Sequence, residues 1–159
     1  MIYDFTADDV FEMAEELERN GAKFYGDAAQ NADNPEYKKL LVGLAEMEVE
    51  HEKTFVNLRS QLSGNEKALT AFDPQNESAL YLKALADTKV FFEKKIDFSS
   101  MKSVLKAAIL AEKDSIVFYF GMKEMVPEQY GKDKLDKIIE EEMDHIKILS
   151  KELVALKNQ

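Results

Sequence analysis

Four glutamates and both histidines of this chain occur in a repeated pattern. A Glu is followed 30 residues later by the segment Glu-x-x-His, and the whole arrangement occurs twice, with an offset of 94 residues (112 − 18). The two sets are Glu18, Glu48 and His51, and Glu112, Glu142 and His145. Four carboxylates and two imidazoles with this spacing are the ligand set of a two-metal site in a four-helix bundle.

These side chains would be unstable together in a protein core without cations. Burying one unpaired carboxylate costs several kcal/mol, and four of them would also repel one another. Two divalent cations would balance the four negative charges. Carboxylate and imidazole ligands suit iron or manganese better than calcium, and zinc also accepts them. We therefore predict two iron ions, with manganese or zinc as alternatives; a metal-free polar network is disfavoured because the motif repeats in register.

Long helices are the elements that must position these residues. The 3-4-3-4 spacing of buried positions passes through the ligands without a break, so they lie on the faces that otherwise carry Leu, Ile and Phe. Such runs are Leu44, Glu48, His51 and Phe55, and Ile138, Glu142, His145 and Leu149. Capping residues and breakers predict helices over residues 6–31, 34–63, 100–127 and 132–157.

The repeat predicts an all-α fold, a ferritin-like four-helix bundle made of two helix pairs. We expect a single domain over 1–159, with helix pairs at 6–63 and 100–157 and a crossover at 64–99. A crossover of this length allows the second and third long helices to run in the same direction. Within it, residues 77–86 are expected to form a short helix, and the apolar residues 90–92 are expected to dock on the bundle.

Composition excludes several other classes of protein. The chain has no Cys, which rules out disulfides, Cys-ligated iron centres and a thiol nucleophile, and which agrees with a reducing cytoplasm. Its net charge of −10 argues against nucleic-acid binding. The N-terminus lacks the features of a secretory signal, and no apolar run is long enough to span a membrane, so we expect a cytoplasmic protein that binds neither membrane nor nucleic acid.

Other residues near the ligands are weaker candidates for function. Tyr25 and Tyr119 each follow a single Glu by seven residues on the same helix face, and could donate hydrogen bonds to ligands, act in redox chemistry or simply fill the core. Gly21 and Ser115 are small residues one turn beyond these Glu residues, and could leave space for an exogenous ligand or permit close helix packing. Glu15, one turn before Glu18, is expected at the surface.

Together these residues resemble the ferritin-like superfamily and, within it, the rubrerythrin group. The resemblance rests on four segments: Glu18-x-x-Gly21-x-x-Phe24-Tyr25, Glu48-x-x-His51, Glu112-x-x-Ser115-x-x-Phe118-Tyr119 and Glu142-x-x-His145. It implies a non-haem di-iron protein that reduces hydrogen peroxide with electrons from rubredoxin. It also implies roles: Glu48 and Glu142 as bridging ligands, Glu18 and Glu112 as terminal ligands, and one histidine on each iron.

The chain departs from the rubrerythrin pattern at two points. It has no cysteines for a rubredoxin domain, so electrons must come from a separate donor such as a rubredoxin. Ser115 stands where rubrerythrins have an additional Glu that takes part in a redox-linked change of iron position. We expect a homodimeric enzyme that reduces peroxide or dioxygen; the alternatives are a ferroxidase that handles iron and a bundle in which metal has only a structural role.

Overall fold

The computed structural model describes residues 6–62, 64, 96–126 and 128–158. Within these ranges the regular structure is helical, with no strand, which confirms the predicted all-α class. The elements are α1 (Ala7–Asn31), α2 (Pro35–Ser60), α5 (Met101–Met125), the 3-10 helix η1 (Glu128–Tyr130) and α6 (Lys132–Lys157). None of the described helices has an apolar stretch long enough to cross a lipid bilayer.

Local sequence signals set most of the helix boundaries as predicted. The Thr6 side chain accepts a hydrogen bond from the backbone N–H of Asp9, whose carboxylate accepts one from the N–H of Thr6, and this capping box starts α1. Asn34 and Ser100 cap α2 and α5 through side-chain oxygens that accept hydrogen bonds from backbone N–H groups of the first turn. Helix α2 ends at Ser60, short of the predicted end near residue 63, because the chain turns at the next residues.

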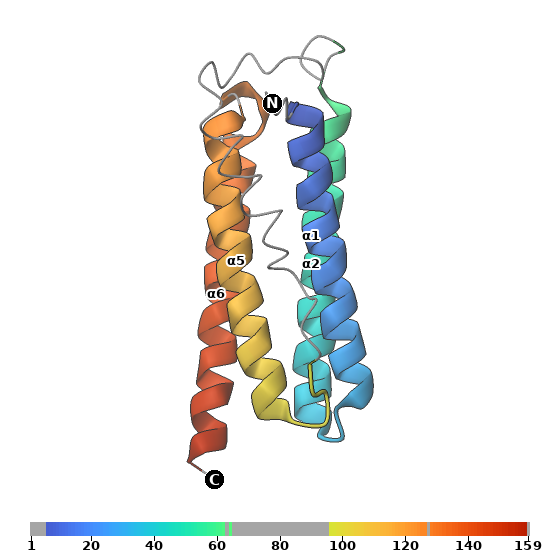
Figure 1. Ribbon diagram of the computed structural model, residues 1–159, viewed down its shortest axis with the longest axis vertical. Coiled ribbons are helices and arrows are strands. Elements are labelled where there is room, and N and C mark those ends of the chain that lie inside the picture. Colours follow the sequence, from blue (N-terminus) through green and yellow to red (C-terminus); the bar gives the residue numbers. More distant parts are fainter. Residues whose placement is uncertain (1–5, 63, 65–95, 127, 159) are drawn as a thin grey trace, which may run out of the picture.

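The four long helices form a bundle of two antiparallel pairs, α1 with α2 and α5 with α6 (Figure 1). Helices α2 and α5 run in the same direction, as the predicted crossover requires (Figure 1). Helix α1 also packs along α5, and α2 along α6. The short helix expected at 77–86 and the apolar residues 90–92 lie outside the described residues.

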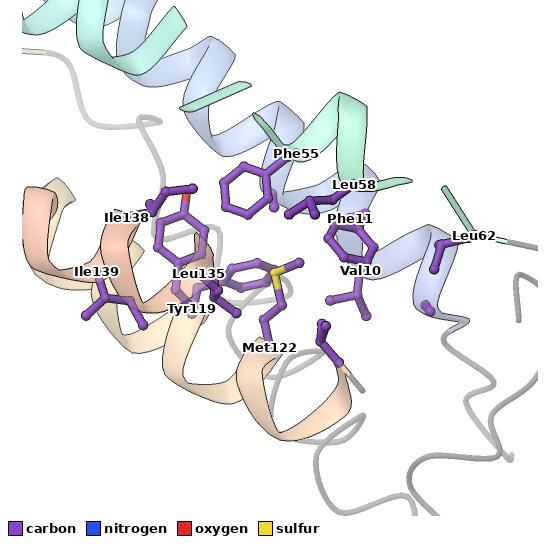
Figure 2. Close-up of a cluster of buried hydrophobic side chains, with 14 residues drawn as sticks. Val10, Phe11, Phe55, Leu58, Leu62, Tyr119, Met122, Leu135, Ile138 and Ile139 are labelled. Carbon is purple, nitrogen blue, oxygen red and sulfur yellow. The ribbon is translucent and has the colours of Figure 1, made fainter. Parts of the chain in front are cut away.

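The core consists of two apolar clusters at different levels of the bundle. One cluster includes Phe11, Phe55 and Leu135 (Figure 2), and the other includes Leu41, Leu105 and Leu149. Along each helix, the predicted ligands fall between the residues of these two clusters. The fold therefore places a layer of ionisable side chains inside an otherwise apolar core.

Candidate metal centre

The structure brings all six predicted ligands to one buried place. None of their exposed fractions exceeds 4%, and those of Glu142 and His145 are 0%. Each long helix contributes: α1 provides Glu18, α2 provides Glu48 and His51, α5 provides Glu112, and α6 provides Glu142 and His145. The 3-residue spacing in Glu-x-x-His puts both side chains of a pair on the same face of the helix. The imidazole rings of His51 and His145 are nearly parallel, with centroids 5.9 Å apart.

The six side chains form two overlapping groups of four. In each group, one ligand atom from every residue lies within 4.8 Å of the others. The groups are Glu18, Glu48, His51 and Glu142, and Glu48, Glu112, Glu142 and His145. Glu48 and Glu142 belong to both groups, whereas the other four residues belong to one each. This is the arrangement expected if two adjacent metal ions were bridged by the carboxylates of Glu48 and Glu142.

Several inward-facing polar atoms have no hydrogen-bond partner among the described residues, although burial normally requires one. His51 Nδ1 lies 2.9 Å from Glu142 Oε1 and 3.5 Å from Glu18 Oε2, but neither His51 Nδ1 nor Glu142 Oε1 makes a hydrogen bond within the described part of the chain. Glu18 Oε2 and Glu48 Oε1 are also buried and make no hydrogen bond to a described residue. Lone pairs that converge without hydrogen bonds are what a bound cation requires, so the residues present fit two metal ions.

Two tyrosines connect the halves of the centre. The Tyr25 hydroxyl on α1 donates a hydrogen bond to Glu112 on α5, and the Tyr119 hydroxyl on α5 donates to Glu18 on α1. Burial, reinforced by the charges of these carboxylates, raises the pKa of both tyrosines well above its ordinary value. Both hydroxyls therefore keep their protons and act as donors. The two carboxylates that these tyrosines hold, Glu112 and Glu18, each belong to only one of the two groups of ligands.

Without cations, the centre balances its charge with protons. Burial raises the pKa of Glu18 and of Glu112 well above the ordinary value, and neighbouring carboxylates raise it further. Burial alone would lower the pKa of the histidines, but the surrounding carboxylates outweigh it and raise the pKa of His51 to about 11 and of His145 to about 12. Burial would also raise the pKa of Glu142, yet its interactions with Glu112 and the imidazoles hold it below the ordinary range.

The small residues beside the ligands have different surroundings. A Cβ atom on Gly21 would lie 2.9 Å from Glu48 Oε2, so the absence of a side chain makes room for that carboxylate. Neither of the two explanations offered by the sequence, an exogenous ligand or close helix packing, includes this contact. Ser115, the counterpart of Gly21, is only partly buried.

The prediction that Glu15 lies at the surface is wrong. Its exposed fraction is 8%, and its carboxylate lies 3.2 Å from Arg59 Nη1 on α2, outside both groups of ligands. Arg59 also binds Asp8 through two hydrogen bonds of 2.9 Å. Arginine on the neighbouring helix supplies the positive charge that allows Glu15 to be buried. Nothing in the sequence of α1 identifies this partner.

One residue in contact with the centre was not predicted from sequence. Glu141 on α6 accepts a hydrogen bond from the outer nitrogen of His51, with 2.8 Å between His51 Nε2 and Glu141 Oε2. In the sequence, Glu141 is one of three consecutive glutamates and has the outward position next to Glu142. Only the packing of α6 along α2 brings it to His51.

The family model of rubrerythrin matches residues 9–153, and this range contains all six residues of the centre. The chain belongs to the rubrerythrin family. Among solved structures, this rubrerythrin-family chain is similar to a Thermotoga maritima protein that is provisionally described as a ferritin-like diiron-carboxylate protein. The two are 25% identical with a TM-score of 0.70, over 95% of this chain and 96% of that one. No curated protein matches the chain.

Rubrerythrin-family membership and the structure agree on the nature of the centre. The family resemblance inferred from the sequence is confirmed, and so is the ferritin-like bundle of two helix pairs. The buried Glu and His residues fit a di-metal carboxylate site.

Proposed function

We propose that this protein is a non-haem di-iron oxidoreductase that reduces hydrogen peroxide. The observation that carries the proposal is the pair of overlapping four-residue groups that share Glu48 and Glu142. Both groups combine carboxylates with one imidazole, a set suited to iron. Family membership supports peroxide as the substrate, because rubrerythrins reduce it.

In this proposal, Glu48 and Glu142 would help to hold both metals, and each remaining Glu and His would help to hold one. When bound, the two iron ions would supply the two electrons that break the O–O bond. Each peroxide takes up two electrons and two protons and leaves as two water molecules. Tyr25 and Tyr119 hold the terminal carboxylates in place through their hydroxyls. The apolar clusters above and below exclude bulk water from the centre.

The electrons must come from outside the chain. It contains no cysteine to bind a second iron centre, so we propose a separate donor of the rubredoxin type. We also propose a cytoplasmic setting and a homodimeric enzyme. A surface pocket of about 440 Å³ lies between α2 and α6 and is lined by His51 and Glu141. This pocket gives a small molecule such as peroxide a way to approach the edge of the centre.

The test is anaerobic reconstitution with ferrous iron, followed by rapid mixing with peroxide or with dioxygen. We expect two iron ions per chain and faster oxidation by peroxide, followed by turnover when reduced rubredoxin is added. Glu142→Ala serves as the inactive control, because it removes a shared ligand. Faster oxidation by dioxygen with accumulation of ferric iron in large assemblies would favour the ferroxidase alternative. An iron-loaded protein that neither oxidant oxidises would leave the metal a structural role.

A further inference from the structure

The two histidines of the centre differ in the contacts of Nε2, the ring nitrogen that faces away from the ligand carboxylates. Both rings turn Nδ1 toward the carboxylates: His51 Nδ1 lies 2.9 Å from Glu142, and His145 Nδ1 lies 3.1 Å from the same residue. On the opposite side of its ring, His51 Nε2 lies 2.8 Å from Glu141 Oε2. His145 Nε2 is buried and has no hydrogen-bond partner among the described residues.

The internal repeat explains why, in the part of the chain that the structure describes, only His51 has this contact. The position that corresponds to Glu141 in the first half is residue 47 (141 − 94), and this residue is Met47. A thioether is at most a weak acceptor, whereas a carboxylate accepts strongly. The ligands are therefore duplicated in the two halves, but among the described residues a carboxylate lies behind the imidazole of His51 and none lies behind that of His145.

Glu141 is well placed to orient the ring of His51. Its side chain is 33% exposed, while that of His51 is only 5% exposed, so Glu141 links a buried ring to the surface. Its other oxygen, Oε1, lies 3.6 Å from Lys137 Nζ, one turn away on α6. If Nδ1 binds a metal, Nε2 carries the proton of the neutral ring and donates a hydrogen bond to Glu141. Such a contact fixes the tautomer and orientation of the ring and makes the histidine a stronger ligand.

We propose that Glu141 is a positioning residue that makes the metal position at His51 the tighter of the two. In this view the centre has two unequal metal positions despite its duplicated ligands, and the His51 position is filled first. The inference rests on the metal-binding part of the proposed function and is independent of the oxidant that the metals react with.

Cobalt(II) titration of the metal-free protein, followed by calorimetry and by visible absorption, tests the inference without turnover. We expect two resolved binding steps in the wild type. Glu141→Leu removes the acceptor and should weaken the tighter step about 10- to 100-fold, while the weaker step changes by less than about 2-fold. The affinity of the tighter step in Glu141→Gln should lie between those of the wild type and Glu141→Leu, since the amide oxygen of Gln still accepts the hydrogen bond. Glu140→Gln is the matched control: it removes the exposed carboxylate at the preceding position of α6.

Two further measurements assign the steps and exclude a general structural effect. His145→Ala should keep the tighter step, and His51→Ala should lose it. The metal-free Glu141→Leu protein should still unfold cooperatively, at a somewhat lower temperature than the wild type because it loses the hydrogen bond to His51. Equal affinities in the wild type, or an equal weakening of both steps in Glu141→Leu, would overturn the inference alone. Failure of the wild type to bind any cobalt would overturn the proposed metal centre as well.

Discussion

The helix pair α1–α2 and the helix pair α5–α6 carry the same ligands in different surroundings. In the first pair, Glu15 and Arg59 form a largely buried ion pair, which Asp8 extends. The corresponding residues of the second pair are Ile109 and Leu153 (15 + 94 and 59 + 94), and both pack against the apolar cluster at their level. At equivalent positions, the first half thus has an ion pair and the second half has apolar side chains.

The difference shows at which positions the two halves need the same residue and at which they do not. Glu48 and Glu142 belong to both groups of ligands, so a change at either one affects the whole centre. Glu15 and Arg59 both belong to the first half, and Glu15 lies outside both groups of ligands. There a buried ion pair and an apolar pair of similar volume can be about equally stable. The symmetry of the molecule is therefore strongest at the centre and decreases outward.

The largest expected effect is a difference in metal content between variants of the ligands that belong to both groups and variants of the ligands that belong to one. Glu48→Ala and Glu142→Ala should each leave less than about one tightly bound metal per chain, because each removes a ligand from both positions. Glu18→Ala and Glu112→Ala should each retain about one, because each removes a ligand from a single position. Elemental analysis after reconstitution and desalting measures the ratio, with circular dichroism to check the fold. Equal losses of bound metal in all four variants would contradict the assignment of Glu48 and Glu142 as shared ligands.

The second expected effect concerns the stability of the metal-free protein as a function of pH. The folded-state pKa values of Glu18 and Glu112 are raised above 4.5, and those of His51 and His145 rise from 6.5 to about 11 and 12. The folded protein therefore keeps protons that the unfolded chain has released, so its stability should fall as the pH rises from 5 to 8. The lowered pKa of Glu142 acts in the opposite sense only below 4.5. Thermal unfolding across this range measures the slope.

Divalent metal should reverse the trend, because it binds the folded, deprotonated centre. At a metal concentration about 1,000 times Kd, the stabilisation is about 4 kcal/mol. Binding at pH 7 should release about two to four protons per chain, measurable by calorimetry in buffers of different ionisation enthalpy. The double variant Glu18→Gln/Glu112→Gln keeps acceptors for Tyr25 and Tyr119 but cannot titrate there. It should show a flatter pH profile in mild acid and little metal-dependent gain; an unchanged profile would contradict the assignment of raised pKa values.

Sequence alone was sufficient for the parts of this protein that depend on spacing along one helix. The register of Glu48, His51, Glu142 and His145 with apolar positions predicted their burial, and the 94-residue repeat indicated that the halves would meet. Capping residues such as Thr6 placed the helix starts. These features are local or periodic, and so they can be inferred without knowing which residues of different helices touch.

The features that escaped prediction depend on contacts between helices. Glu15 reads as a surface residue until Arg59 of α2 is seen beside it, and Glu141 reads as one member of an acidic run until α6 packs along α2. The tyrosines were recognised as candidates, but their bonds cross from each half to the Glu of the other half, which spacing within one helix does not determine. Side-chain partners across a bundle follow from helix rotation and axial offset, and the sequence pattern fixes neither closely enough.

The smallest expected effect sharpens the comparison at Gly21 and Ser115, which occupy equivalent positions in the two halves. A Cβ atom at residue 21 would lie 2.9 Å from Glu48 Oε2, closer than such atoms normally approach. In the metal-free protein, this carboxylate is the end of a flexible side chain and can move aside. In the metal-bound protein, it is proposed to bridge both metals, so the same movement would disturb both.

Gly21→Ala should therefore separate stability from metal binding. The metal-free protein should be as stable as the wild type or more stable by up to about 1 kcal/mol, because Ala favours a helix over Gly. Metal affinity should fall about 10-fold, equivalent to about 1.4 kcal/mol of binding free energy. Gly26→Ala is the matched control on α1, since a Cβ atom there has nothing within 4 Å and should leave metal affinity unchanged. Ser115→Ala, which only removes a hydroxyl, should change affinity less than Gly21→Ala does. Equal affinities for Gly21→Ala and Gly26→Ala would mean that the space beside Glu48 is not needed by the metal-bound centre, and that the two halves are equivalent at this position.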